Sequence, residues 1–254
     1  MGLFSTLLGR PRAERIARFP HGRVGYAVGD IHGRADLLAR MLDRLEADAT
    51  TSDAPVAVFL GDYIDRGPDS RLVLELLLEP RPRGFERRFL LGNHEAALLA
   101  FLRDPEIGRA WLRHGGVPTL RAYGVTPPSL DAPADAFAAA AAALRARMPA
   151  LHRDFLERLE RSVVYGGYAF VHAGVDPRKP LEAQSDRDLL WAREAFLKAR
   201  RAHEYVIVHG HTPEEKPYAD HRRIGVDTGA YATGKLTAVR LVGADVSFLT
   251  LGPT

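Results

Sequence analysis

Short apolar runs alternate with amphipathic stretches at the start of the chain. The runs have the length and composition of buried strands, and they cover Val24–Val28, Val56–Leu60 and Phe89–Leu91. Apolar residues at helical spacing predict helices over about 36–48, from an Asp69-Ser70 cap to Leu78, and from the GNHE stretch to about Arg103. This βαβαβα order predicts one sheet of parallel strands, because a helical crossover connects successive strands.

The regularity ends after Arg103, and residues 104–162 predict a mainly helical insertion over one end of the sheet. The signals are a Gly-Gly break, a Pro-Pro pair, an alanine-rich run at 136–143 and a helical-looking stretch at 150–161. We expect residues here to shape a cleft wall and determine specificity, namely Trp111, His114, Gly115, Gly116 and Tyr123. A loop at Asp227–Gly229, near Tyr231, is expected to contribute to the same wall.

Strand-like runs return in the second half of the chain. They cover Val163–Tyr165, Tyr168–Val171, Tyr205–Val208, Ile224–Val226, Lys235–Leu241 and Val246–Leu251. The last two are separated by the turn residues Gly243-Ala244-Asp245 and predict a closing hairpin. Between these strands, Trp191-Ala192-Arg193 is interpreted as the start of a helix.

Length and composition indicate a globular chain with one main domain. The chain has 254 residues, 46% of them apolar, which suits a single α/β domain over 24–254 that carries the insertion. No stretch approaches the roughly 20 apolar residues that cross a membrane. The start of the chain lacks the pattern of a signal peptide, so we expect a cytoplasmic location. The absence of cysteine excludes disulfides, thiolate zinc sites and cysteine-nucleophile phosphatase chemistry.

Positive charge is concentrated in residues 1–23, which form a predicted basic N-terminal arm. This segment holds five arginines against one glutamate, so the rest of the chain is close to neutral despite an overall net charge of +3. A neutral body argues against a nucleic-acid partner, because such proteins carry a basic stripe on the folded domain. The arm is a candidate contact with a membrane or a partner through Phe4, Leu7 and Leu8.

Five stretches place potential metal ligands where predicted strands end. They are GDIHG at 29–33, GDYIDRG at 61–67, GNHE at 92–95, VHAG at 171–174 and HGHT at 209–212. Asp30, Asp62 and Asn93 are 32 and 31 residues apart, close to one βαβ step of roughly 30 residues. Because parallel strands end at the same edge of a sheet, these side chains are expected to meet there.

The residue types in these stretches suit two divalent metal ions. Asp30 and His32 stand two apart in an extended segment and project to the same side, and the Asp62 carboxylate can give one oxygen to each of two metals. The neutral donors Asn93, His172 and His211 would complete the second ion's shell. Oxygen and nitrogen ligands without thiolate suit Mn²⁺, with Fe or Zn²⁺ as alternatives. A single stretch of this kind could be an ordinary cap or turn, but five in series indicate a metal site.

Four further residues predict phosphoester chemistry beside the metals. His94 would face the cleft and protonate a leaving oxygen, and Asp65 is the carboxylate that would orient it. An N-cap role for Asp65 is the structural alternative. Arg66 and Arg193 are the candidate phosphate clamp, because a guanidinium matches two phosphate oxygens. Because 31 of the 35 basic residues are arginine, a single arginine is weak evidence for phosphate binding. The prediction for Arg66 depends on its position in the GDYIDRG stretch.

With these stretches in this order, residues 24–235 resemble the calcineurin-like metallophosphoesterases. More narrowly, the chain resembles the bacterial and phage serine/threonine protein phosphatases related to the eukaryotic phosphoprotein phosphatase family. The resemblance implies an α/β fold of four layers, αββα, in which a β-sandwich is flanked by helices. It also implies Asp30, His32 and Asp62 at the first metal, and Asp62, Asn93, His172 and His211 at the second.

The resemblance implies phosphomonoester hydrolysis, in which a hydroxide bridging the metals attacks phosphorus directly. A phosphorylated protein is the expected substrate, with phosphoserine or phosphothreonine ahead of phosphotyrosine, and a small phosphate ester is the alternative. The symmetrical diadenosine tetraphosphate hydrolases are a rival group, but they typically lack an acid at the position of Asp65 and read GNHD. A phosphodiesterase and a non-catalytic metal-binding regulatory protein are more remote alternatives. Pro213 replaces a histidine common elsewhere in the superfamily, and His209 is expected to be structural or to support the ligands.

Overall fold

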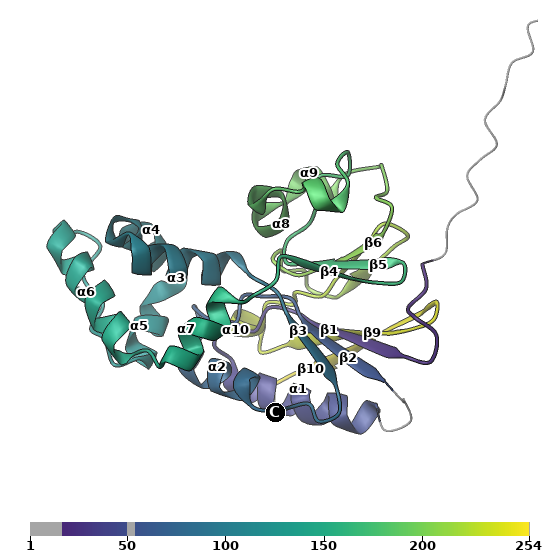
Figure 1. Cartoon of the computed structure of the whole chain (residues 1–254), viewed down its shortest axis with the longest axis horizontal. Helices are drawn as coiled ribbons and strands as arrows, with labels where there is room; N and C mark the ends of the chain where they lie inside the picture. Colours follow the sequence, from purple (N-terminus) through teal and green to yellow (C-terminus); the bar gives the residue numbers. More distant parts are fainter. Residues whose placement is uncertain (1–16, 50–53, 254) are drawn as a thin grey trace, which may run out of the picture.

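Two five-stranded sheets pack face to face at the centre of the protein (Figure 1). The computed structural model describes residues 17–49 and 54–253. The first sheet has the order β10-β9-β1-β2-β3, formed by Asp245–Leu251, Leu236–Val242, Val24–Val28, Pro55–Phe59 and Glu86–Phe89. The second has the order β4-β5-β6-β8-β7, formed by Ser162–Tyr165, Tyr168–Val171, Val206–His209, Arg223–Gly225 and Tyr218–Ala219.

Helices cover the outer face of each sheet, which gives the four layers. Helices α1 (Ala35–Asp48) and α2 (Ser70–Leu78) lie under the first sheet, while α8 (Asp186–Trp191) and α9 (Glu194–Leu197) lie over the second (Figure 1). Strand β1 shows why the sandwich forms: Tyr26 and Val28 join the cluster that contains α1, and Ala27 joins the cluster between the sheets. The fold expected from the resemblance is therefore confirmed.

The parallel pairing of the first three strands is also confirmed. Strand β1 pairs in parallel with β2, and β2 with β3, while β9 and β10 form the closing hairpin at the other edge. The position of β3 was predicted wrongly, because it covers Glu86–Phe89 and not Phe89–Leu91. This edge strand carries charged side chains that are paired across the surface, as in the ion pair of Arg88 with Glu160, so it lacks an apolar signature.

The segment between α3 (Asn93–Arg103) and β4 is mainly helical. It contains a 3₁₀ turn at Pro105–Ile107, α4 (Gly108–Trp111), a π-helical turn at Leu112–Gly116, α5 (Val117–Ala122), α6 (Ala134–Arg147) and α7 (Ala150–Glu157). These helices lie beside α3 at one end of the sandwich (Figure 1). Trp111, Gly116 and Tyr123 are buried, whereas Gly115 is half-buried and His114 is exposed.

Two shorter elements complete the fold of the described residues. A 3₁₀ turn covers Leu181–Ala183, and α10 covers Ala230–Thr233. The helix start expected at Trp191 is a helix end, since α8 finishes there and α9 begins after Arg193.

Only the last part of the predicted N-terminal arm lies within the described residues. Phe19 is 2% exposed and packs against Tyr165, so residues 17–23 lie on the body of the protein. Residues 1–16, with the proposed membrane or partner contacts, fall outside the described part. Within residues 17–49 and 54–253, no helix is long and apolar enough to cross a membrane.

Candidate metal centre

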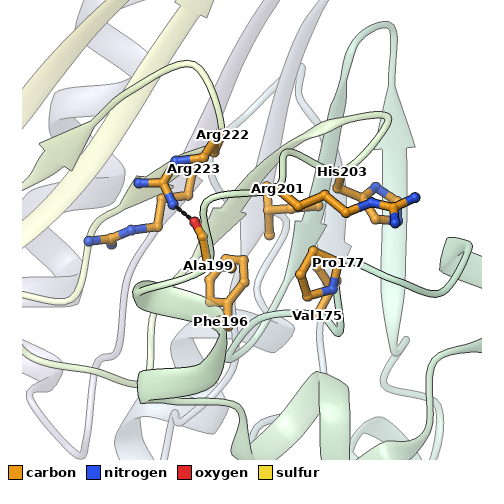
Figure 2. Close-up of a pocket in the computed structure, with 9 residues that line it drawn as sticks. Val175, Pro177, Phe196, Ala199, Arg201, His203, Arg222 and Arg223 are labelled. Carbon is orange, nitrogen blue, oxygen red and sulfur yellow. Dashed lines mark hydrogen bonds between the residues drawn. The ribbon is translucent and has the colours of Figure 1, made fainter.

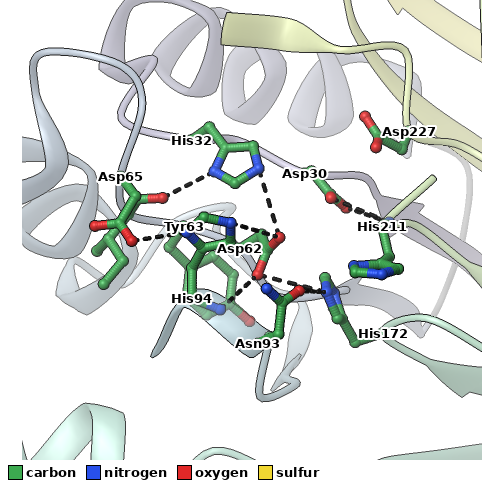
Figure 3. A network of polar contacts seen from close by, with 12 residues as sticks. Asp30, His32, Asp62, Tyr63, Asp65, Asn93, His94, His172, His211 and Asp227 are labelled. Atoms are coloured by element: carbon green, nitrogen blue, oxygen red, sulfur yellow. Dashed lines mark hydrogen bonds and ion pairs between the residues drawn. The ribbon is translucent and has the colours of Figure 1, made fainter. Parts of the chain in front are cut away.

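The predicted ligands meet where strands of both sheets end. Asp30 follows β1, Asp62 follows β2, Asn93 begins α3 after β3, and His172 and His211 follow β5 and β6. Figure 3 shows their side chains pointing toward one another. The six predicted ligands, which include His32, are 0–6% exposed. The chain thus buries several ionisable groups together, which is unfavourable unless charge is compensated.

Strained backbone conformations are concentrated at this site. Within the described part of the chain, five residues other than glycine have positive φ angles: His32 (46°), Asp62 (51°), Asp65 (70°), Arg66 (66°) and His211 (64°). Each such residue costs about 1–3 kcal/mol. All five were predicted from sequence as site residues, so the strained backbone lies within the candidate site.

Glu95 stabilises the strained loop that carries Asp62. Its carboxylate accepts hydrogen bonds from the backbone N–H groups of Asp62 (2.9 Å) and Tyr63 (2.8 Å), and also from those of Ile64 (3.2 Å) and Gly92 (3.1 Å). Glu95 is fully buried, and burial with the nearby Asp62 charge raises its pKa to about 8. This role of Glu95 was not predicted, although the glutamate stands in the GNHE stretch beside the candidate ligand Asn93.

Asp62 lies between two groups of nitrogen donors. Its Oδ2 is 3.5 Å from His32 Nε2 and 3.9 Å from His94 Nε2, whereas its Oδ1 is 3.4 Å from His172 Nε2. Two clusters therefore share Asp62, one with His32 and His94 and one with His172 and His211. Each oxygen of a single carboxylate faces a different set of ligands, which is the arrangement that a bridging residue requires.

The histidine tautomers show that the donors fit a cation. His32 Nδ1 donates to the Ile64 carbonyl at 2.9 Å, which leaves an unprotonated Nε2 that is buried and has no hydrogen-bond partner. His172 Nδ1 likewise donates to the Leu60 carbonyl at 2.9 Å, so its Nε2 lone pair faces Asn93 Oδ1 at 2.9 Å. A cation between two lone pairs that point at one another stabilises the arrangement. Histidines that bind a metal typically donate their other ring N–H to a backbone carbonyl, as His32 and His172 do here.

Burial keeps most of these imidazoles neutral. It lowers the pKa of His32 and that of His211 to about 3, in His211 with help from the neighbouring His172 charge. Neutral imidazole is the form that binds a metal. Asp30 accepts from the backbone N–H of His211 at 3.0 and 3.1 Å. Burial and the charge of Asp227 raise the pKa of Asp30 well above its usual range, so this pair of acids also favours a bound cation.

His94 and Asp65 form the contact that the sequence predicted. His94 Nδ1 lies 2.7 Å from Asp65 Oδ2, so the carboxylate holds one ring nitrogen and leaves Nε2 toward Asp62. Burial lowers the pKa of His94, but the charges of Asp62 and Asp65 outweigh it and raise the pKa overall. A histidine that keeps its proton beside a reacting oxygen can act as a general acid.

The two predicted phosphate-binding arginines make different contacts next to the cluster. The Arg66 guanidinium lies 4.8 Å from the centre of the Tyr231 ring, which in turn contacts His32 edge to face at 5.3 Å. Arg193 is exposed, and its Nε donates to His211 Nε2 at 3.2 Å. That hydrogen bond and metal binding through the same nitrogen exclude each other, so such binding would release Arg193.

A separate pocket between α9 and the second sheet is small. It has a volume of about 10 Å³, and Phe196 and Arg223 are among its lining residues (Figure 2). Arg223 pairs with Glu214 at 3.2 Å and contacts His209 Nε2 at 3.2 Å. His209 thus contacts Arg223 and not the ligand cluster, in keeping with a structural role.

Comparison with known proteins identifies relatives of the whole domain. The family described as Calcineurin-like phosphoesterase matches residues 26–243. The chain is 30% identical over 221 residues to serine/threonine-protein phosphatase 1 of Salmonella typhimurium, covering 85% of this chain and 91% of that protein.

A second relative has a different name. The chain is 27% identical over 239 residues to the asymmetrical bis(5'-nucleosyl)-tetraphosphatase PrpE of Geobacillus thermodenitrificans, covering 84% of this chain and 88% of that protein. Among solved structures, a cold-active protein-tyrosine phosphatase of a psychrophile Shewanella species aligns with a TM-score of 0.55 over 92% of this chain and 84% of that one. At 18% identity, this structure shows the shared fold alone.

Proposed function

Because the chain belongs to the calcineurin-like phosphoesterase family and is a hydrolase acting on phosphoric esters, we propose that it dephosphorylates phosphoserine and phosphothreonine in proteins. The observation that carries the proposal is the 2.7 Å contact of Asp65 with His94 beside the shared carboxylate of Asp62. Removing phosphate from serine or threonine expels an alkoxide, a poor leaving group that needs a proton. A site with a dedicated proton donor suits that substrate.

We propose that the family's divalent metals bind through Asp30, His32, Asp62, Asn93, His172 and His211. Two ions, Mn²⁺ by preference and Fe or Zn²⁺ as alternatives, would supply an activated water and neutralise charge on the phosphoryl group. Asp62 holds the two ligand groups together, and Glu95 fixes the Asp62 backbone.

The remaining side chains bind and protonate the substrate in this proposal. Arg66 and Arg193 bind phosphoryl oxygens, and His94, held by Asp65, protonates the departing oxygen. Hydrolysis is direct, without a covalent phosphoenzyme. Inversion at a chiral phosphorus would support direct hydrolysis, and retention would contradict it.

A dinucleoside tetraphosphatase is the second candidate, and the PrpE relative favours it. The name of that relative specifies asymmetrical cleavage, whereas the rival group expected from the sequence cleaves symmetrically. The products distinguish the two kinds of cleavage, because an asymmetrical cut gives a nucleoside triphosphate and a monophosphate, and a symmetrical cut gives two diphosphates. The leaving group is then a phosphate, which departs without a proton. A His94 proton donor oriented by Asp65 would therefore contribute little to the rate.

One substrate panel tests the choice. Wild type and Asp65→Asn would be compared on phosphoserine peptides, phosphotyrosine peptides, mononucleotides and diadenosine tetraphosphate with Mn²⁺. We expect the substitution to slow phosphoserine cleavage on the order of 100-fold or more, the usual contribution of a positioned proton donor. Equal slowing of the dinucleotide, or faster wild-type turnover of the dinucleotide than of every phosphopeptide, would overturn the protein phosphatase proposal.

A further inference from the structure

The Asp65 carboxylate is bound by side chains of the helical insertion. Asp65 is fully buried, and its Oδ2 accepts from Trp111 Nε1 at 2.8 Å in addition to His94 Nδ1. Its Oδ1 accepts from the Thr119 hydroxyl at 2.5 Å. Trp111 ends α4 and Thr119 lies in α5, so two of these three side-chain donors come from a segment about 50 residues away in sequence.

Thr119 fixes both the side chain and the backbone of Asp65. A threonine hydroxyl has one hydrogen, and here it goes to Asp65 Oδ1, so Thr119 Oγ1 acts as an acceptor in its other contacts. It accepts from the Asp65 backbone N–H at 3.1 Å, and Ser70 Oγ lies 3.0 Å away as the donor of the remaining bond. This network stabilises a residue whose φ angle is 70°.

Packing holds the Trp111 indole in the same place. Its ring lies 4.9 Å from that of Phe101, and a Cβ added at Gly116 would come within 2.5 Å of the indole. The segment Leu112–Gly116, which is kinked at Gly115 with a φ angle of 114°, connects Trp111 to α5. The indole N–H is therefore directed at Asp65 by its surroundings.

We infer that Trp111 and Thr119 are positioning residues for proton transfer by His94, an inference that rests on the proposed role of His94. They fix the two oxygens of Asp65, so the carboxylate cannot rotate and the imidazole keeps Nε2 directed at the leaving oxygen. The insertion is then part of the reaction machinery. The consequence is selective, because a misaligned proton donor slows the loss of a poor leaving group and spares a good one.

Two variants remove one donor each. Trp111→Phe keeps an aromatic ring without the N–H, and Thr119→Val keeps the shape without the hydroxyl. With Mn²⁺-loaded protein, we expect each to lower kcat for a phosphoserine peptide on the order of 10-fold, with little change in kcat for p-nitrophenyl phosphate, whose leaving group needs no proton. Thr119→Ser, which restores the hydroxyl, should recover phosphoserine turnover.

Two controls separate positioning from packing and from the proposed function. Leu144→Val loosens the packing of the insertion at α6 without removing a donor to Asp65, and His94→Asn removes the proposed acid itself. Substrate selectivity in Trp111→Phe, Thr119→Val and His94→Asn, but not in Leu144→Val, would support the inference. Equal losses on both substrates in the first two variants, or selectivity in Leu144→Val, would overturn it while leaving His94 as the acid. If His94→Asn is itself unselective, the proton-donor role fails and the positioning role fails with it.

Discussion

At the residue scale, two buried carboxylates, Asp62 and Glu95, organise the candidate metal centre. Asp62 faces His32 with one oxygen and His172 with the other, and its backbone keeps a positive φ angle of 51°. The Glu95 carboxylate binds the N–H groups of Asp62 and two following residues, which offsets the strain. Glu95 therefore holds the backbone of the loop that carries Asp62.

Replacing Glu95 with glutamine should loosen this loop. The new amide nitrogen would face backbone N–H groups that now bind a carboxylate oxygen, and a buried donor left without an acceptor is unfavourable. We expect the free energy of unfolding to fall by roughly 3 kcal/mol and Mn²⁺ affinity to fall with it. Urea unfolding measures the first and calorimetric titration the second. Glu106→Gln, on the exposed surface of the insertion, is the matched control; equal stability of both variants would contradict the role of Glu95.

The ten candidate site residues were easier to identify from the sequence than the residues that position them. Aspartate, histidine and asparagine near glycine at strand ends are visible locally, whereas Arg193 lies outside these stretches. Glu95 and Trp111 act through contacts 31–46 positions away, and such contacts depend on how the loops pack. A buried tryptophan in a helical segment gives no local sign that its N–H binds a carboxylate.

At the scale of elements, the π-helical turn fixes the loop that contains Arg66. The Gly115 carbonyl accepts from the Arg66 backbone N–H at 3.0 Å. Gly115 has a φ angle of 114°, and a Cβ there would come within 2.8 Å of Arg66 Cγ. The insertion thus contacts the candidate phosphate-binding residue as well as Asp65.

Gly115→Ala should weaken phosphate binding through this contact. Gly84→Ala is a matched control, because Gly84 also has a positive φ angle of 78° but nothing lies within 4 Å of an added Cβ. Both substitutions should destabilise the protein by about 1–2 kcal/mol through backbone strain. Only Gly115→Ala should raise KM for a phosphopeptide, by about tenfold, as expected for a weakened charged hydrogen bond. An equal KM for the two variants would show that Arg66 does not depend on this turn.

Most elements were predictable because their apolar periodicity reflects burial. Strands β1 and β2 are buried on both faces and read as continuous apolar runs. The charged edge strand β3 and the two-residue β7 lack that pattern, and neither was located correctly. The four-layer sandwich was expected from the family resemblance, but the order of the strands in its two sheets was not predicted, because periodicity does not show which strands pair.

At the scale of the whole molecule, the two sheets bring ligands from distant parts of the chain to one edge. Asp30 and His211 are 181 positions apart, yet the backbone of one binds the carboxylate of the other. Without a cation, the converging carboxylates Asp30, Asp62 and Asp227 repel one another, and the His172 Nε2 lone pair faces the Asn93 oxygen. Metal binding should therefore stabilise the entire fold and not only the site.

Thermal unfolding of the metal-stripped protein should show this coupling. Mn²⁺ at 100 times its dissociation constant adds about 2.7 kcal/mol per site, which corresponds to a rise in Tm of roughly 5–10 °C for a protein of this size. Asp62→Asn should show a much smaller rise, because both ligand groups share that carboxylate. A similar rise in the variant would indicate that Mn²⁺ stabilises the protein elsewhere.

In the proposed centre one carboxylate, Asp62, joins two metal sites built by this chain. Anomalous diffraction at the manganese edge, from crystals soaked in Mn²⁺, shows where the ions bind. We predict two peaks about 3.5–4 Å apart on either side of the Asp62 carboxylate, one beside His32 and one beside His172 and His211. A single peak, or peaks that do not contact Asp62, would contradict the account.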